Sequence, residues 1–433
     1  MEISGWGRYP KIDADIQFPK TGNECAHVLR SSGSIIPRGL GRSYGDSSLA
    51  SQVLETTELQ YFQEFNPETG VLACDAGVSL YEILNVFVPK GWFLPVTPGT
   101  RFVTVGGAIA SDVHGKNHHI DGTFCEHVLS FDIALGNGEI VTASPMQNPD
   151  LFRATCGGMG LTGVIIAARI RLKPIVSSDI LETTIKAPNL DAVLDGFEKY
   201  AQSTYSVAWI DCLAKGADLG RSLLMIGEHA SDGGLKLASK KPMTIPMDAP
   251  TQLLNPLSIK AFNTLYYGKV LQAEQSRRTS FETYFYPLDQ MLHWNRLYGK
   301  PGFLQYQFVV PSASGREGMR RILEEITASG QGSFLAVLKA FGKQNDNLLS
   351  FPFEGYTLAL DFKVSPGIFA LLDRLDQLVL QYGGRLYLAK DARMTEQTFK
   401  ASYPRWQEFE EVRSKYHAAG KFASLQSKRL GLA

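Results

Sequence analysis

The sequence predicts an α+β protein with two domains and a helical C-terminal segment. Its 433 residues are more than one ordinary hydrophobic core accommodates, so two domains are expected. Residues 1–175 show short strand and helix patterns in alternation, whereas residues 176–384 combine aromatic-rich strand patterns with longer helices. The boundary falls near Lys173-Pro174, and residues 385–433 are again mostly helical.

The clearest local signals of the first domain are a capping box and a hairpin. Ser79 followed by Glu82 predicts the start of a short helix, which ends near Gly91. The turn Gly136-Asn-Gly138 lies between two apolar runs and predicts a β-hairpin. The hairpin strands are 128–135 and 139–143; further strands are expected at 33–37, 71–76 and 164–172, and a helix at 151–155.

The second domain is marked by aromatic strands and by one segment without periodicity. Strands are expected at Thr283–Tyr286 and Phe303–Pro311, where aromatic and apolar residues gather. Residues 240–258 are rich in Pro, Met and Leu and predict a mobile apolar loop. Helices are expected at Arg316–Ser329, Ile368–Gln381, Thr395–Tyr403 and Arg405–Tyr416.

Composition indicates a soluble globular protein, with 44% apolar and 20% charged residues. Lys plus Arg and Asp plus Glu both total 43, so nothing indicates a nucleic acid as partner. Five scattered cysteines without CxxC spacing predict reduced thiols in a cytoplasmic protein. The chain shows no signal-peptide pattern and no bilayer-length apolar run, so we expect a soluble protein, or at most a peripheral one.

Two glycine-rich segments carry the strongest functional signal. The first is residues 37–47, PRGLGRSYGDS, and the second is residues 98–116, PGTRFVTVGGAIASDVHGK. Glycine lets the main chain approach a ligand closely and lets its amides point at a pyrophosphate without a side chain in the way. Two such segments in one domain predict one long cofactor that is held at two places.

Two further motifs have simpler interpretations. Residues 158–163 match GxGxxG, but they follow a helix and precede a strand, the reverse of what a nicotinamide dinucleotide site requires. We therefore expect a tight turn there. His114, His118 and His119 lie close in sequence, yet no cluster of Asp, Glu or Cys accompanies them. Since zinc and iron sites need three or four ligands arranged by the fold, we expect no metal.

Several strings in both domains, in the same order, resemble the decaprenylphosphoryl-β-D-ribose 2′-oxidase family of the vanillyl-alcohol oxidase superfamily, whose FAD-binding domain is of the PCMH type. The resemblance implies an FAD-binding domain at 1–175, a substrate domain with an antiparallel sheet at 176–384, and a segment at 385–433 that returns to the FAD domain. The strings are PGTR (98–101), VGGAIA (105–110), HGKNHH (114–119), WNRxYG (294–299), GFLQYQF (302–308) and GGRLYxAKD (383–391).

The resemblance also implies which residues bind FAD. In this superfamily the pyrophosphate lies along the first glycine segment and the isoalloxazine rests against the second. Tyr387 is similar to the residue that returns from the C-terminal segment to meet the flavin. The implied set is Pro37, Arg38, Gly39, Leu40, Gly41, Arg42, Ser43, Tyr44, Gly45, Asp46, Ser47, Gly99, Thr104, Val105, Gly106, Gly107, Ser111, Asp112, Val113, His114, Ile166 and Tyr387.

For the substrate, the resemblance places Lys390 and His114 nearest the reacting carbon and leaves open which of them is the base. A lysine with a lowered pKa can accept a proton. Gln305 and Gln307 are two apart on a strand, so both amides face the same side. The implied substrate-binding set is Lys116, Trp209, Tyr286, Gln305, Gln307, Lys339 and Lys390; for Trp209, Tyr286 and Tyr44, ordinary aromatic packing is an equal alternative.

Two positions depart from relatives. Several superfamily members carry a His in the first glycine turn that bonds covalently to the flavin, and this chain has Arg42 there. A guanidinium is no nucleophile at neutral pH, so we predict non-covalent FAD. Family members with a reactive pocket cysteine have it two residues before an Asp, where this chain has Ala359 before Asp361. We predict resistance to inhibitors that bond to that thiol.

The resemblance implies an FAD-dependent enzyme that oxidises the 2′-hydroxyl of a polyprenyl-phosphate-linked ribose, as the first half of epimerisation to arabinose. A nicotinamide-dependent keto-sugar reductase would be its partner, and quinone or oxygen its electron acceptor. One alternative is a soluble sugar or aldonolactone oxidase, against which Arg42 and the string Tyr403-Pro-Arg405 argue. The other is a flavin-bearing binding module without catalysis.

Overall fold

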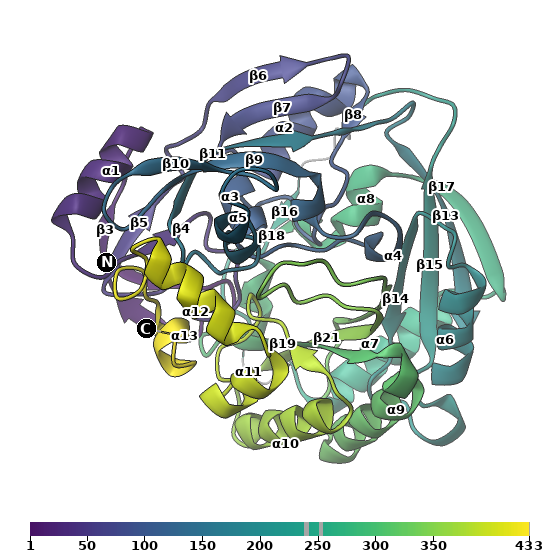
Figure 1. The fold of residues 1–433 in the computed structure, drawn as a ribbon. Helices are drawn as coiled ribbons and strands as arrows, with labels where there is room; N and C mark the ends of the chain where they lie inside the picture. Colours follow the sequence, from purple (N-terminus) through teal and green to yellow (C-terminus); the bar gives the residue numbers. More distant parts are fainter. Residues whose placement is uncertain (238–241, 251–253, 433) are drawn as a thin grey trace.

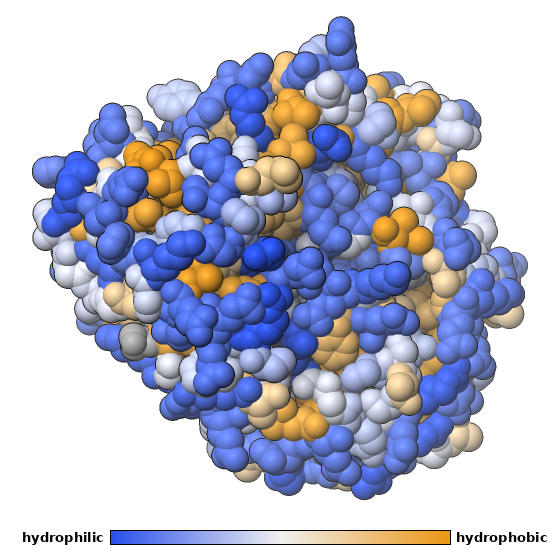
Figure 2. Space-filling view, in the orientation of Figure 1, coloured by the Kyte–Doolittle hydropathy of each residue, from blue (hydrophilic) through white to orange (hydrophobic). Residues whose placement is uncertain are grey.

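The computed structural model describes residues 1–237, 242–250 and 254–432 (Figure 1). Three larger sheets organise it, and the predicted two-domain α+β fold is confirmed. Both chain termini lie on the same side of the molecule, on the left in Figure 1, the side that also carries α1 (Gly22–Ser31). On the face drawn in Figure 2, polar residues dominate and apolar residues form small separate groups.

Two sheets build the N-terminal part of the chain. A parallel sheet of three strands has the order β3 (Asp15–Gln17), β5 (Gln52–Glu55), β4 (Ile36–Arg38). An antiparallel sheet of five strands has the order β10 (Ile140–Ala143), β9 (Val128–Ala134), β11 (Val164–Arg171), β7 (Val71–Asp75), β6 (Phe62–Asn66).

The helices of this part follow their sequence signals. The Ser79 hydroxyl accepts from the N–H of Glu82 and the Glu82 carboxylate accepts from the N–H of Ser79, which starts α2 (Leu80–Phe87) as predicted. Gly91 ends the helical turn that follows, with a φ of 84°. The other helices are α3 (Val105–Ala110), α4 (His118–Asp121) and α5 (Pro149–Thr155).

An antiparallel sheet of eight strands dominates the second part. Helices α6 (Leu190–Lys199), α9 (Ser312–Ser329) and α10 (Ile368–Gln381) cover one face of it (Figure 1). The strand order is β17 (Glu274–Ser280), β13 (Asp179–Ala187), β15 (Ser222–His229), β14 (Tyr205–Ile210), β20 (Ala336–Phe341), β21 (Gly355–Lys363), β19 (Phe303–Pro311), β22 (Arg385–Leu386).

The C-terminal segment contacts both parts. Helix α11 (Glu396–Ser402) packs on α10 and α12 (Trp406–Lys415) packs on α5. Phe422 bridges Ile35, and α13 (Leu425–Arg429) brings Arg429 to within 2.7 Å of the Asp46 carboxylate. The remaining short elements are β1 (Glu2–Ser4), β2 (Lys11–Asp13), β8 (Trp92–Phe93), β12 (Lys173–Pro174), β16 (Met243–Thr244), β18 (Met291–Leu292) and five 3-10 turns starting at residues 88, 124, 216, 287 and 294.

Two sequence predictions about the second part were wrong. Residues 283–286 do not form a strand, because the Ser280 hydroxyl accepts from the N–H of Thr283 and starts helix α8 (Phe281–Phe285). The predicted loop at 240–258 contains strand β16, and its last residues begin helix α7 (Pro256–Gly268), which Asn255 caps. Residues 240–241 and 251–253 of that prediction lie outside the described residues.

Candidate active site

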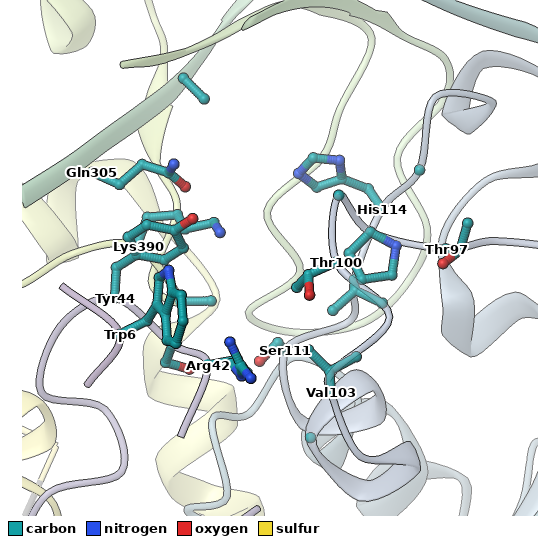
Figure 3. Close-up of a pocket in the computed structure, with 18 of the residues that line it drawn as sticks. Trp6, Arg42, Tyr44, Thr97, Thr100, Val103, Ser111, His114, Gln305 and Lys390 are labelled. Atoms are coloured by element: carbon teal, nitrogen blue, oxygen red, sulfur yellow. The ribbon is translucent and has the colours of Figure 1, made fainter. Parts of the chain in front are cut away.

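A cavity of about 550 Å³ lies between the N-terminal sheets and the uncovered face of the eight-stranded sheet. Figure 3 shows its two sides: Trp6, Arg42, Tyr44, Gln305 and Lys390 face Thr97, Thr100, Val103, Ser111 and His114 across it. Both glycine segments contribute to its walls, so the fold brings together two segments that lie about sixty residues apart.

The first glycine segment begins at the end of β4 and leaves main-chain donors free. Gly41 has a φ of 62°, a conformation that glycine adopts without strain. Within the described part of the chain, the main-chain N–H groups of residues 39–43 have no hydrogen-bond acceptor. The segment is fixed at its end, where the N–H of Tyr44 donates to the carbonyl of Ala389 at 3.0 Å. A row of unpaired amides beside a cavity suits a phosphate.

The second segment touches the first. The Thr104 hydroxyl caps α3 by accepting from the N–H of Gly107 at 3.1 Å. A Cβ on Gly39 would collide with that same hydroxyl, so glycine is required where the two segments cross. Gly99 has no atom within 4 Å of an added Cβ and faces open space in the cavity wall.

Arg42, at the position where several relatives carry the covalent His, packs on an aromatic ring. Its guanidinium carbon lies 4.1 Å from the ring centroid of Trp6. Burial lowers the pKa of Arg42, and the nearby Asp289 carboxylate opposes that shift. The Asp289 carboxylate also accepts from the hydroxyl of Thr100 at 2.7 Å and from the N–H of Arg101 at 2.9 Å. Arg42 therefore sits in a fixed cation–aromatic arrangement at the cavity wall.

His114 is held between two polar side chains of the eight-stranded sheet. Its Nε2 lies 3.1 Å from Gln307 Nε2, and its Nδ1 lies 3.2 Å from Lys339 Nζ. Gln307 Nε2 also donates to the hydroxyl of Thr357 at 3.2 Å. Burial, followed by the charge of Lys339, lowers the pKa of His114 well below its usual value, so the imidazole is neutral.

Three partly buried lysines line the cavity, and desolvation lowers the pKa of each. The pKa values are about 7 for Lys116, about 7 for Lys339 and about 8 for Lys390. Lys390 Nζ lies 3.9 Å from the ring centroid of Tyr44, and the Asp361 carboxylate partly opposes the fall in its pKa. Lys116 Nζ donates to the carbonyl of Tyr284. These amines can hold an anion or, when neutral, accept a proton.

Most of the residues that the sequence singled out line the cavity. From the predicted cofactor set these are Pro37, Arg38, Gly39, Leu40, Gly41, Arg42, Ser43, Tyr44, Ser47, Gly99, Thr104, Gly106, Gly107, Ser111, Val113, His114 and Tyr387. From the predicted substrate set they are Lys116, Trp209, Gln305, Gln307, Lys339 and Lys390.

Three predicted site residues with polar or aromatic side chains do not line the cavity, because other groups of the protein bind these side chains. The Asp46 carboxylate pairs with Arg429 at 2.7 Å. The Asp112 carboxylate accepts from Asn345, Asn347 and Ser350 at 2.7–2.9 Å. The Tyr286 hydroxyl lies 2.6 Å from that of Thr97, behind the wall.

Three smaller residues are also placed away from the cavity. Gly45 is packed against the carbonyl of Asp391, and Val105 is buried in the apolar core. Ile166 points to the opposite face of β11, against α1, and its neighbour Ile165 lines the cavity instead. Side chains alternate along a strand, so an error of one residue moves the side chain to the other face.

Lys390 lies in a turn that follows a strand of two residues. Strand β22 ends at Leu386, and the chain then turns, with the N–H of Lys390 donating to the carbonyl of Tyr387 at 3.0 Å. The Tyr387 hydroxyl donates to the carbonyl of Ser111 at 2.9 Å, which joins this turn to the second glycine segment.

Sequence reasoning missed several residues of the wall. Trp6 and Asp289 line the cavity although neither belongs to a motif. The turn at residues 157–163 forms as expected between α5 and β11, but Met159, Gly160 and Gly163 also line the cavity. The one available signal was the repeated glycine in that turn, which permits a close approach of the main chain.

Comparison with known proteins defines the class. Residues 16–144 match the family model of the FAD binding domain, and residues 344–430 match that of D-arabinono-1,4-lactone oxidase. With a cavity lined by two glycine segments, these matches define an FAD-dependent oxidoreductase of the vanillyl-alcohol oxidase type.

Individual relatives show to which family within this class the chain belongs. The chain is 37% identical to decaprenylphosphoryl-beta-D-ribose oxidase of Mycolicibacterium smegmatis, over 99% of this chain and 97% of that protein. It is 31% identical to an uncharacterized protein in the mprA 5′ region of Streptomyces coelicolor, over 82% of this chain and all of that protein. The match to D-arabinono-1,4-lactone oxidase of Yarrowia lipolytica is shorter: it covers 33% of this chain and 28% of that protein, at 29% identity. The chain belongs to the decaprenylphosphoryl-β-D-ribose oxidase family.

The residues of the cavity fit FAD. The unpaired amides at residues 39–43 are donors of the kind that a pyrophosphate requires, and Gly99 leaves room beside the second segment. Among the described residues, no group of three or more His, Cys, Asp or Glu side chains is placed to hold a metal ion. None of the helices in the described ranges combines the length and hydropathy of a bilayer-spanning segment.

Proposed function

We propose that the protein oxidises the 2′-hydroxyl of a polyprenyl-phosphate-linked ribose to the 2′-keto sugar, the first half of epimerisation to arabinose. The observation that carries the proposal is the polar wall that His114, from the second glycine segment, forms with Gln307 and Lys339, which are linked to it at 3.1–3.2 Å. Buried donors and acceptors that converge on one cavity suit a sugar with several hydroxyls. The relative that covers the whole chain is named for such a substrate.

The main-chain amides of residues 39–43 would hold the FAD pyrophosphate, and residues 99 and 104–107 would support the ring system. When bound, FAD accepts the hydride that leaves the alcohol carbon. Gln307 and Lys116 would hold the sugar hydroxyls and fix the carbon. Both ring nitrogens of His114 face protein partners, so His114 positions Lys339 and is not itself the base.

The hydroxyl proton would pass to a neutral lysine. Lys339 and Lys390 both line the cavity, and their lowered pKa values, about 7 and about 8, keep a fraction of each amine unprotonated near neutral pH. Removal of the proton lets the C–O bond become a carbonyl as the hydride departs. The two lysines differ in their surroundings, since only Lys390 has a carboxylate, Asp361, among the groups that shift its pKa.

The rest of the pathway follows from the chemistry. A keto sugar must be reduced from the opposite face to give arabinose, so a nicotinamide-dependent reductase would consume the product. Quinone or oxygen would reoxidise the flavin. A polyprenyl substrate resides in a membrane, so we propose peripheral contact of a cytoplasmic protein with the inner membrane face, or of an exported one with the periplasmic side.

The test is anaerobic reduction of the flavin. Purified holoprotein is mixed with polyprenyl-phosphoryl ribose without oxygen, and the flavin absorbance is followed; mass spectrometry of the lipid should show the loss of two hydrogens. Absence of bleaching with authentic substrate would refute the assignment. A flavin-bearing binding module is tested with Lys390→Ala, because such a module would keep its ligand affinity in this variant and its flavin would never be reduced.

A second candidate is a soluble lactone or sugar oxidase, which the match of residues 344–430 to the D-arabinono-1,4-lactone oxidase family favours. It predicts hydrogen peroxide release from free lactones or pentoses in air. The same preparation can be assayed for both activities, and a lipid-linked substrate that reduces the flavin while free sugars do not would exclude the second candidate.

A further inference from the structure

Helix α7, Pro256–Gly268, packs one face on the eight-stranded sheet. Ile259 and Asn263 are buried there, and the Asn263 amide donates to the Asp211 carboxylate at 2.8 Å. The ring of Tyr266 packs on Trp209 with centroids 4.8 Å apart. These contacts fix which side of the helix is turned outward.

The outward side of α7 is apolar. Leu257 and Leu265 are 80% and 75% exposed, and Leu271, just beyond the helix, is 89% exposed. Leu257, Ala261 and Leu265 are spaced by four residues, so they form one stripe along the helix, on the side away from Asn263. We call Leu257, Ala261, Leu265 and Leu271 the α7 stripe. Exposed leucines in such a group commonly mark a contact surface.

The charged side chains that α7 itself carries have one sign, and the Asp211 carboxylate lies on the buried side of the helix, against Asn263. Lys260 and Lys269 lie on the helix and at its end, and residues 249–273 contain no Asp or Glu. Lys269 Nζ lies 3.4 Å from the ring centroid of Tyr266. Leucines with flanking lysines are the composition of a helix that lies in the interface of an anionic bilayer, where long cationic side chains reach the head groups.

The α7 stripe and the active-site cavity share one wall. Tyr266 on the inner side of α7 and Trp209 on β14, which pack on each other, both line the cavity, together with the apolar Met225, Leu335 and Val337. The helix is thus one layer between the cavity and the outward leucines. An apolar chain that left a bilayer at the α7 stripe would meet these apolar residues of the cavity wall.

We propose that the α7 stripe lies on the surface of an anionic lipid bilayer and places the cavity next to the membrane from which the substrate comes. The choice of a bilayer over a protein partner rests on the proposed function, since a prenyl-linked substrate must be taken from lipid. Lys260 and Lys269 contribute attraction to anionic head groups, and the leucines contribute insertion.

The experiment is sedimentation of the holoprotein with vesicles. Vesicles of phosphatidylcholine mixed with phosphatidylglycerol should bind it, and vesicles of phosphatidylcholine alone should bind it less. The double variant Leu257→Glu, Leu265→Glu should lower the partition coefficient by about tenfold or more. Lys260→Gln and Lys269→Gln should each lower it by about fivefold at low salt. Met146→Glu is the matched control, because Met146 is an exposed apolar residue on the turn after β10.

Flavin content and the melting temperature verify that each variant is folded. The proposal is overturned if wild type does not bind the mixed vesicles, or if the double Glu variant binds as well as Met146→Glu. It is also overturned if wild type forms dimers in sedimentation velocity that the double variant abolishes, since a second copy would then cover the α7 stripe. The vesicle experiment needs no substrate, so the two proposals are tested independently. A protein that does not bind vesicles does not contradict 2′-oxidation, and a flavin that is not bleached does not contradict vesicle binding.

Discussion

Lys339 Nζ lies 3.2 Å from Nδ1 of His114, and the charged groups that act on this amine are two further lysines, Lys116 and Lys390. Burial and these like charges all favour the neutral amine. The Gln307 amide nitrogen can only donate, so Nε2 of the neutral imidazole accepts from it and the single N–H of the ring is at Nδ1, facing Lys339. The site therefore holds a neutral amine beside an imidazole that does not easily take up a proton. A neutral amine in this position is suited to accept a proton from an alcohol.

The first prediction concerns pH. The pKa of Lys339 is lowered to about 7, so the amine is charged below that pH and neutral above it. If Lys339 is the base, the rate of anaerobic flavin reduction rises as pH increases through about 7. Lys339→Met should lower the rate by about 100-fold or more and remove the rise, since general base catalysis commonly contributes that much. Stopped-flow absorbance across the pH range measures both effects.

Lys390→Met is the matched comparison for that experiment. Its wild-type pKa is about 8, and Asp361 beside it favours the charged form, so we expect Lys390 to act as a cation that holds the substrate. Lys390→Met should weaken substrate binding and retain the rise in rate near pH 7. A rise that survives in Lys339→Met and disappears in Lys390→Met would assign the base to Lys390 instead.

The second prediction concerns the contact between the glycine segments. A Cβ at residue 39 collides with the Thr104 hydroxyl, so Gly39→Ala must separate the two segments that we propose to hold FAD. We expect FAD affinity to fall by about tenfold or more, which is about 1.4 kcal/mol. Gly33→Ala is the control, because a Cβ there has its nearest neighbour, Gln52 Oε1, at 4.0 Å. Equal FAD affinities of the two variants in a fluorescence titration would contradict the prediction.

The same preparations test the attachment of FAD. Arg42 stacks on Trp6 and offers no nucleophile for a covalent bond. Acid precipitation should leave the yellow colour in the supernatant. A flavin that remains with the precipitated chain would show that another residue carries it.

The sequence was informative where short-range rules decide the structure. The Ser79 capping box and the turn at 136–138 are local signals, and both elements form as predicted. The prediction of a strand at 283–286 was wrong because it relied on the aromatic content of these residues and overlooked Ser280, which caps a helix there. Local patterns also could not show that Asp46 is engaged by Arg429, which lies 383 residues further along the chain.

The sequence predicted mainly those parts of the site that offer main-chain groups to a ligand. The glycine segments can be recognised from their composition alone. Trp6, in contrast, reaches the cavity only because the N-terminal chain passes between the loop at Tyr44 and strand β19. In detail, the N–H of Gly7 donates to the carbonyl of Tyr44 and the N–H of Phe303 donates to the carbonyl of Gly7. No spacing rule predicts such a long-range contact, so tryptophan at this position carries no sequence signal.

The third prediction concerns Ala359. It lies on β21 opposite Gln307 and lines the cavity, so a thiol there would face the substrate side. The five native cysteines are buried and unpaired. Inhibitors that bond to a pocket thiol should therefore leave the wild-type mass unchanged, and Ala359→Cys should gain one adduct by intact mass spectrometry. An adduct on the wild-type protein would contradict this.

The fourth prediction concerns Arg413, which is completely buried. Its guanidinium donates to the carbonyls of Leu161, Phe422 and Leu432 at 2.8–3.0 Å and thereby ties α12 to the turn before β11 and to the chain end. Arg413→Met leaves these carbonyls without donors, so the free energy of unfolding should fall by about 3 kcal/mol. Arg316→Ala, which removes exposed ion pairs with Asp195 and Glu198, should cost less than about 1 kcal/mol. Calorimetry of the two variants should show a clearly lower melting temperature for Arg413→Met, and equal values would mean that water replaces the lost donors.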